Sequence, residues 1–177
     1  NLPKCLINIW CGCGKTRIIV YKIFDDNQSL NVIVFPSLGL INQFNNDYIL
    51  KSDWVEKFAD YKCMSFCSDN EKKLKEETDK IKYTTDEKKL TKFLKFRSKK
   101  ILTVTYQSFE KFVEIVWVAK VRINRLYYDE AHHVVGDSIK DLVFKKDESD
   151  KTQWLELIDK TEYYTATPIN KNGIIMY

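Results

Sequence analysis

The 177-residue sequence predicts an α/β fold in which a mostly parallel central sheet carries helices on both faces. Short β-branched runs alternate with runs of helical period, the pattern of strands joined by helical crossovers. The apolar run 5–10 leads through a glycine-containing turn into a helix-forming run, and the run 123–128 ends directly in Asp129. We expect five or six strands in one domain that spans residues 1–177.

The first part of the chain has the alternation that this fold requires. Residues 31–35 are a β-branched run typical of a buried parallel strand. Ser37 is then a favourable N-cap, and Leu38, Ile41 and Phe44 share one face of the helix that follows. The expected elements are a strand over 5–10, a helix over 16–24, a strand over 31–35, a helix from residue 38, a short helix over 54–58 and a strand over 61–66.

The second part continues the alternation after a polar segment. Residues 68–86 are lysine-rich and lack an apolar period, so we expect a surface loop there. Asp86 is a favourable N-cap, and the tyrosine pairs at 127–128 and 163–164 are expected to pack in the core. The later elements are expected to be a helix over 87–96, strands over 101–104, 123–128 and 162–165, and helices over 107–113 and 154–158.

Composition narrows the class of protein. Hydrophobic residues make up 44% of the chain and charged residues 31%, which is typical of a globular domain. No apolar run approaches the roughly 20 residues needed to span a bilayer, and no signal-peptide pattern opens the sequence. The five cysteines lack paired spacing. We therefore expect free thiols, an intracellular location and no membrane partner.

Residues 9–16, Ile-Trp-Cys-Gly-Cys-Gly-Lys-Thr, predict a phosphate-binding turn. A glycine turn before a helix points backbone N–H groups inward, and the helix N-terminus adds partial positive charge. Lys15 would then reach the β- and γ-phosphates of a nucleotide, and the Thr16 hydroxyl would bind Mg²⁺. The usual motif has one more glycine where this chain has Ile9, so a chance turn is the alternative. We expect Trp10 to pack at the strand end rather than on the nucleotide.

The turn Asp129-Glu130-Ala131-His132 follows another predicted strand. In a parallel sheet the carboxyl ends of the strands open on one edge, so Asp129 and Thr16 would meet there and share one Mg²⁺. Glu130 would orient or deprotonate an attacking water. His133 beside His132 is not expected to form a metal pair, because adjacent side chains on a turn point apart.

With both turns in place, the sequence resembles the first RecA-like P-loop NTPase domain of superfamily 2 helicases and translocases with a DEAH box, and is similar to the motors of type III restriction enzymes. Motif I is 12–16, motif II is 129–132, and motif III resembles Thr165-Ala166-Thr167-Pro168. Motif Ia resembles 36–40, and 103–108 is similar to a strand-end threonine motif. The resemblance implies ATP and Mg²⁺ as cofactors. The implied residues are Cys11, Gly12, Cys13, Gly14, Lys15, Thr16 and Arg17 for the nucleotide, Lys15, Asp129, Glu130 and His132 for catalysis, and Thr16 and Asp129 for the metal.

The resemblance also implies partners. Nucleic acid is expected, with DNA preferred over RNA, together with a second RecA-like domain of a longer chain and a nuclease or modification partner. The second domain would supply an arginine finger, so this chain alone is expected to bind nucleotide weakly and to turn it over slowly or not at all. The residues implied for strand contact or for coupling to His132 are Pro36, Ser37, Gln43, Thr105, Gln107, Thr165 and Thr167.

Charge is unevenly distributed. The formal net charge is +4, yet residues 61–100 hold 13 Lys or Arg against 7 acids, a local excess of +6. This segment is either a solvated face or an electrostatic guide for nucleic acid. Two other functions stay open: a P-loop enzyme of another class, such as a kinase, and a non-catalytic scaffold that keeps the fold for interactions.

Overall fold

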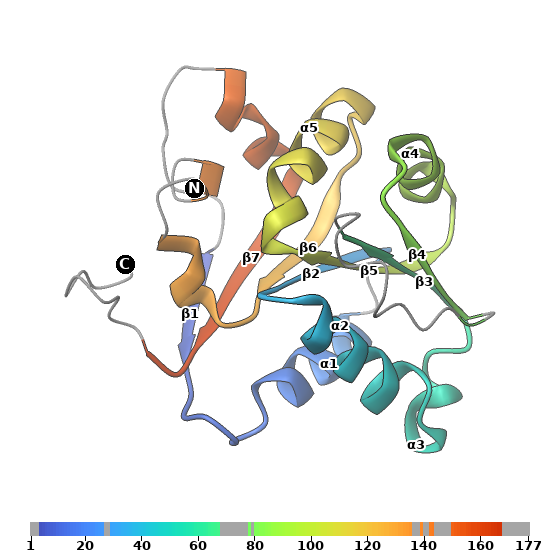
Figure 1. Cartoon of the computed structure of the whole chain (residues 1–177), viewed down its shortest axis with the longest axis vertical. Helices are drawn as coiled ribbons and strands as arrows, with labels where there is room; N and C mark the ends of the chain where they lie inside the picture. Colours follow the sequence, from blue (N-terminus) through green and yellow to red (C-terminus); the bar gives the residue numbers. More distant parts are fainter. Residues whose placement is uncertain are drawn as a thin grey trace.

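The computed structural model describes residues 4–26, 29–67, 78, 80–135, 139, 142–143 and 150–167. Within these ranges, seven parallel strands form one sheet in the order β1-β7-β6-β2-β5-β3-β4 (Figure 1). The strands are β1 (Lys4–Asn8), β2 (Leu30–Phe35), β3 (Tyr61–Phe66), β4 (Ile81–Thr84), β5 (Lys99–Thr105), β6 (Ile123–Tyr128) and β7 (Ile158–Thr165). The predicted α/β class with a parallel sheet is confirmed.

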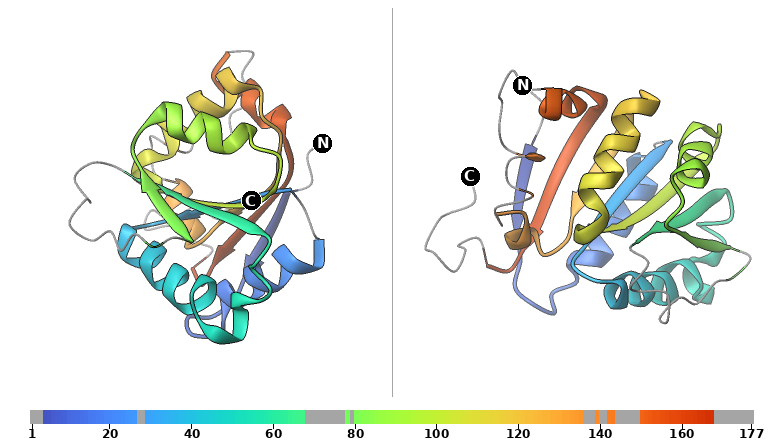
Figure 2. Two further views of the ribbon diagram at one scale, coloured as in Figure 1. Left: turned by 90° about the vertical axis from the view of Figure 1, so that its right-hand side faces the viewer. Right: turned by 45° about the horizontal axis from the view of Figure 1, so that its top comes forward.

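Helices cover both faces of the sheet, as predicted (Figures 1 and 2). The α-helices are α1 (Lys15–Asp26), α2 (Leu38–Phe44), α3 (Ser52–Val55), α4 (Glu87–Lys95) and α5 (Phe109–Ala119). A π-helical turn, Asn45–Ile49, continues α2, and 3₁₀ helices occupy Tyr106–Ser108, Ala131–Val135 and Asp150–Leu157. Helices α1 to α3 lie on one face, and α4 and α5 lie on the other.

Each face has its own apolar core because successive strand residues point to opposite sides. On the α1 side, Ile33 and Tyr127 of the sheet belong to the same buried cluster as Ile19 of α1. On the α5 side, Leu102 belongs to the cluster that contains Phe109. The two tyrosine pairs at 127–128 and 163–164 are buried between these layers, as predicted.

The expected loop over 68–86 is wrong at residues 81–84, which form the edge strand β4. Ile81 and Tyr83 are buried, whereas Lys82 between them is exposed, so this strand has the period of two that a half-buried edge requires. Residues 68–77 and 79 of that segment lie outside the described residues.

The boundaries near the end of the chain also differ from expectation. Strand β7 begins at Ile158 rather than at residue 162, and the helix before it is a 3₁₀ helix that ends at Leu157. The expected helix over 107–113 starts as a 3₁₀ turn and continues in α5 as far as Ala119. No helix in the described ranges is long and apolar enough to cross a membrane.

The strand register brings the motif-bearing turns to one edge of the sheet. Asn8 at the end of β1 lies opposite Thr165 at the end of β7. Phe35 of β2 lies opposite Thr105 of β5, and Tyr128 at the end of β6 lies between β2 and β7. The turns that follow these strands therefore open on the carboxyl edge, where ligands of open α/β sheets bind.

Candidate functional site

The glycine turn lies between β1 and α1, at the carboxyl edge. Gly12 has a φ of +80° and Gly14 a φ of +83°, a region that side-chain-bearing residues rarely adopt. The Trp10 carbonyl accepts a hydrogen bond from the Cys13 N–H at 3.3 Å, and the Gly14 carbonyl accepts from Ile18 at 3.1 Å in the first turn of α1. The local backbone thus has the shape of an anion-binding turn at a helix N-terminus.

Lys15 is the first residue of α1, and its side chain is buried. Its Nζ lies 3.0 Å from Oε1 of Glu130, in the turn after β6. Glu130 has a φ of +48°, so the backbone is held in the left-handed region at that residue. The structure therefore brings the two predicted motifs into direct contact, with one cation and one carboxylate between them.

Asp129 is 5% exposed, and its backbone N–H donates to the Val34 carbonyl at 2.9 Å. Among the described residues, its Oδ1 is buried without a hydrogen-bond partner. Burial, and then the charge of Glu130, raise the pKa of Asp129 to about 6, although Lys15 opposes this rise. A buried carboxylate oxygen that lacks a donor is a suitable ligand for a hard cation.

His132 links this turn to the end of β7. Its Nδ1 lies 3.2 Å from the Thr165 hydroxyl and 3.5 Å from Oε2 of Glu130. The Thr165 hydroxyl also donates to the Thr167 carbonyl and accepts from the Thr167 N–H. Burial, and then His133, lower the pKa of His132, whereas the charge of Glu130 opposes this fall.

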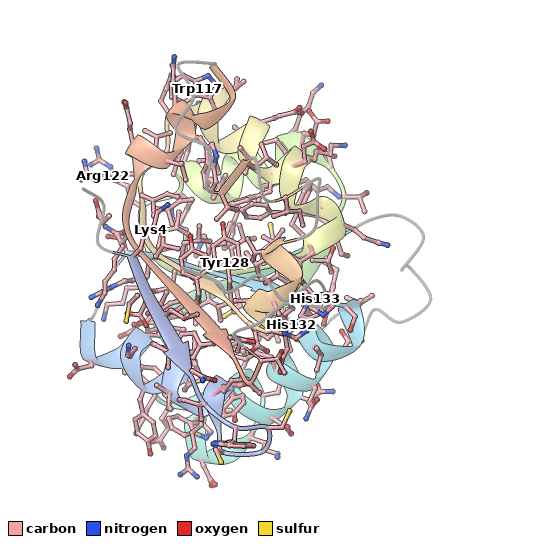
Figure 3. All side chains as sticks on the ribbon, turned by 90° about the vertical axis from the view of Figure 1, so that its left-hand side faces the viewer. Lys4, Trp117, Arg122, Tyr128, His132 and His133 are labelled. Carbon is pink, nitrogen blue, oxygen red and sulfur yellow. The ribbon has the colours of Figure 1, made fainter. Side chains whose placement is uncertain are left out.

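The two histidines lie just beyond Tyr128 and β6 (Figure 3). Their ring centroids are 4.4 Å apart. Within the described residues no group of three or more His, Cys, Asp or Glu is arranged to hold a metal. Pro168, the last residue of the motif III resemblance, lies outside the described residues.

The residues expected to contact a nucleic-acid strand differ in exposure. Three of them are exposed: Ser37 just before α2, Gln43 on α2, and Gln107 after β5. Ser37 also caps α2, because its hydroxyl accepts from the Leu40 N–H. Thr105 is fully buried and donates to Ser108 at 3.3 Å, so the structure does not support a direct strand contact by this side chain.

The positions of two side chains near the site differ from what the sequence indicated. Trp10 is 83% exposed, so the expectation that it packs at the strand end is wrong. Tyr106 is buried, and its hydroxyl donates to the Asp129 carbonyl at 2.9 Å, which connects the turn after β5 to the turn after β6. A tyrosine after a strand carries no distinguishing pattern in sequence, since its partner is a backbone carbonyl.

The remaining nucleotide candidates lie where the turn meets solvent. Cys11 and Cys13 are exposed free thiols, as expected from the cysteine spacing. Thr16 is half-buried, and Arg17 is exposed with its guanidinium 5.8 Å from the centroid of the Tyr21 ring.

The profile of the type III restriction enzyme res-subunit family (ResIII) matches residues 1–170. The chain belongs to this family. The resemblance to superfamily 2 motors of the type III restriction kind is therefore confirmed, and the chain is a helicase-type ResIII domain. No curated protein matches it.

Solved structures similar to this ResIII domain support its RecA-like fold. It is similar to the type ISP restriction-modification enzyme LlaGI, solved with a DNA substrate mimic, at 23% identity and a TM-score of 0.63 over 99% of this chain. It is also similar to LlaBIII bound to DNA, at 18% and 0.58 over 94%. The Hef helicase domain of Pyrococcus furiosus matches at 16% and 0.59 over 94%. The ResIII domain spans 14%, 11% and 30% of those chains.

Proposed function

We propose that the chain is the ATP-binding domain of a nucleic-acid-dependent ATPase, a helicase or DNA translocase that couples ATP hydrolysis to strand movement or unwinding. The observation that carries this proposal is the 3.0 Å ion pair between Lys15 and Glu130. It joins the glycine turn to the carboxylate turn, and phosphoryl transfer needs both a phosphate cradle and a residue that handles the nucleophile.

The glycine turn would hold the phosphates of ATP. The backbone is left-handed at Gly12 and Gly14, and α1 begins immediately after them, which favours anion binding by the N–H groups of this turn. Lys15 would exchange Glu130 for the β- and γ-phosphates. Glu130, released from Lys15, would then be available to orient or deprotonate water.

Thr16 and Asp129 would hold Mg²⁺. The orphaned Oδ1 of Asp129 supports this assignment, because a buried carboxylate oxygen without a donor is stabilised by a bound cation. When bound, the ion neutralises charge that develops on the phosphates.

His132 would couple changes at the nucleotide site to the residues at the end of β7. It contacts Glu130 on one side and Thr165 on the other, and Thr165 bonds Thr167. We propose that this relay links hydrolysis to strand contacts by Pro36, Ser37, Gln43 and Gln107. Phosphate contacts of this kind position a strand without reading its sequence.

We propose DNA as the preferred nucleic acid, because two of the similar structures are restriction-modification enzymes with DNA or a DNA mimic bound. The proposal also includes a second RecA-like domain, which would supply an arginine finger, and a nuclease or modification partner. It places the protein inside the cell, without a membrane partner.

The test measures ATP binding and ATP hydrolysis with and without single-stranded DNA. We expect weak binding and slow turnover that DNA increases, and Lys15→Ala should remove both activities. Lys120→Ala is the matched control, since Lys120 is exposed and follows α5. Phosphoryl transfer to a small acceptor without DNA would indicate a P-loop enzyme of another class. DNA binding that ATP and Lys15→Ala leave unchanged would indicate a non-catalytic scaffold.

A further inference from the structure

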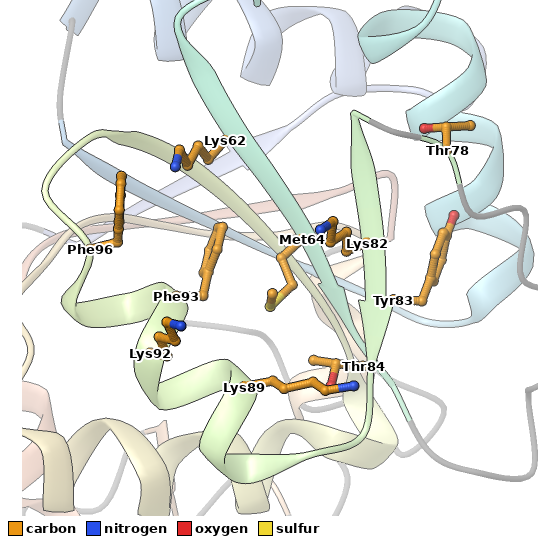
Figure 4. A pocket seen from close by; sticks show the side chains of 10 residues that line it. All are labelled: Lys62, Met64, Thr78, Lys82, Tyr83, Thr84, Lys89, Lys92, Phe93 and Phe96. Carbon is orange, nitrogen blue, oxygen red and sulfur yellow. The ribbon is translucent and has the colours of Figure 1, made fainter.

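A second candidate binding surface lies far from the glycine turn. The glycine turn follows β1, one edge strand of the sheet, and the second surface lies beside β4, the other edge strand. A pocket of about 1010 Å³ is bounded by β3, β4 and α4 (Figure 4). Strand β4 is the edge strand farthest from β1, and four strand spacings separate it from β6. At about 4.8 Å per spacing, the pocket edge is roughly 19 Å across the sheet from Asp129.

Four lysines from three elements line this pocket, which we name the α4 groove: Lys62 of β3, Lys82 of β4, and Lys89 and Lys92 of α4. All four side chains are exposed. Among the residues that the structure describes, no Asp or Glu lines the pocket, and none of the four lysines makes an ion pair. Other surface cations do have such partners; Lys51 pairs with Asp47 and Lys111 with Glu87. The described side chains that line the α4 groove therefore carry a net positive charge, although Asp86 lies close enough to Lys89 for their charges to interact.

Aromatic rings accompany these charges. Phe93 and Phe96 line the α4 groove, and Phe96, directly after α4, is 46% exposed. The Nζ of Lys62 lies 3.5 Å from the centroid of the Phe96 ring. On α4, Lys89, Lys92 and Phe93 have the three- and four-residue spacings of one helix face, and Phe96 follows directly as the C-cap, whereas Leu90 and Leu94 are buried against the core. The helix thus presents a mixed basic and aromatic face to the pocket.

We propose that the α4 groove binds a segment of single-stranded nucleic acid, outside the helicase motifs. Lysines would neutralise successive phosphates, and the exposed phenylalanine ring would stack on a base. A compact anion is a poorer fit, because the four ammonium groups come from three elements around a large open volume. The proposal rests on the nucleic-acid binding in the proposed function and adds a site through which the strand is held.

The test is fluorescence anisotropy of labelled oligo-dT with the 177-residue chain over a range of salt concentrations. The double variant Lys62→Ala/Lys92→Ala should weaken binding at least tenfold at low salt. It should also reduce the slope of log K against log[salt] by about 1.4, since each single-strand phosphate contact contributes about 0.7. Phe96→Ala should weaken binding about tenfold with little change of slope. The matched control, Lys57→Ala/Lys120→Ala, removes the same charge from exposed positions elsewhere and should bind as the wild type does.

The outcomes separate this proposal from the wider one. If the wild type binds oligo-dT and the groove variants bind equally well, the groove proposal is overturned while the motor function stands. If the wild type binds no nucleic acid, both fail. Displacement of oligo-dT by polyglutamate as effectively as by an oligonucleotide of equal charge would assign the groove to an acidic protein segment instead. Binding of a duplex that depends on the lysines, with no effect of Phe96→Ala on oligo-dT, would overturn base stacking.

Discussion

The Nζ of Lys15 and Oε1 of Glu130 are 3.0 Å apart, and this ion pair connects the turn after β1 to the turn after β6. The Lys15 side chain is 7% exposed and that of Glu130 is 24% exposed, so water screens the pair only in part. The carboxylate of Glu130 thus pairs with the Lys15 ammonium, the same group that would bind the phosphates of ATP. Phosphate binding and the ion pair therefore compete for Lys15.

Glu130→Gln should strengthen ATP binding by about 3- to 10-fold, because it removes the carboxylate that competes for Lys15. The same change should abolish hydrolysis if Glu130 handles the water. Calorimetric titration with ATP and Mg²⁺ measures the first effect, and a phosphate-release assay measures the second. Glu156→Gln changes an exposed carboxylate after α5 and should alter neither quantity. Weaker ATP binding by Glu130→Gln would refute the competition.

Asp129 should make the ligand-free protein less stable as pH rises from about 4 to about 6. Burial raises the pKa of Asp129 to about 6 in the folded state, above its unfolded value near 4, so the folded protein binds the extra proton in that window. Asp129→Asn should therefore raise the free energy of unfolding at pH 7 by about 1–3 kcal/mol and flatten its pH dependence. Urea unfolding at several pH values measures both. Asp60→Asn, at an exposed position, is the control, and equal pH profiles for the two variants would contradict the prediction.

Glu162→Gln should destabilise the fold by about 2–4 kcal/mol. Glu162 is 1% exposed in β7, and its carboxylate accepts from Lys22 at 2.7 Å and from the Tyr164 hydroxyl at 2.7 Å, with Lys160 at 3.0 Å. Removing the anion leaves Lys22 and Lys160 without this counter-charge and removes the carboxylate that lies 3.7 Å from the partly buried Arg125. Thermal unfolding compared with Glu114→Gln, an exposed change on α5, measures the loss; equal midpoints would contradict it.

The same carboxylate adds a pH dependence of opposite sign to that of Asp129. Burial opposes ionisation of Glu162, but hydrogen bonds from Lys22, Tyr164 and Lys160 outweigh it and lower the pKa of Glu162. Its stabilisation is present above the unfolded pKa, near 4.3, and is lost as pH falls through the lower folded value. The difference between wild type and Glu162→Gln should therefore shrink below about pH 4.

The charged residues of β7 also explain why sequence alone placed its start too late. Asp159 and Lys160 interrupt the apolar pattern, so only residues 162–165 were predicted to form a strand. In the fold, each charged residue of β7 has a partner from another element or its own strand, such as Arg122 for Asp159 and Lys22 for Glu162. Local sequence does not show partners that the sheet register and α1 provide.

Strand β4 was missed for a related reason. Its four residues follow a lysine-rich segment, and alternation over only Ile81 and Tyr83 is a weak signal. The architecture was predictable because strand and helix periods are local, and the contact between Lys15 and Glu130 follows from the shared carboxyl edge. The exposure of Trp10 and the burial of Thr105 depend on tertiary packing, which short motifs do not encode.

Thr165→Val should uncouple hydrolysis from DNA while ATP binding is retained. The Thr165 hydroxyl contacts both His132 and Thr167, and valine keeps the shape but lacks these hydrogen bonds. We expect the DNA-dependent increase in turnover to fall at least fivefold, with the ATP dissociation constant unchanged within twofold. His132→Ala should give the same loss, and the two changes together should be no worse than either alone. Glu114→Ala, at an exposed position on α5, is the control, and additive losses from Thr165→Val and His132→Ala would contradict a shared relay.

A structure of the chain with a non-hydrolysable ATP analogue and Mg²⁺ tests the central claim most directly. The account predicts that Lys15 leaves Glu130 and contacts the β- and γ-phosphates above Gly12 and Gly14, with the metal held between Thr16 and Asp129. Lys15 still paired with Glu130, and the analogue bound elsewhere or absent at saturating concentration, would contradict it.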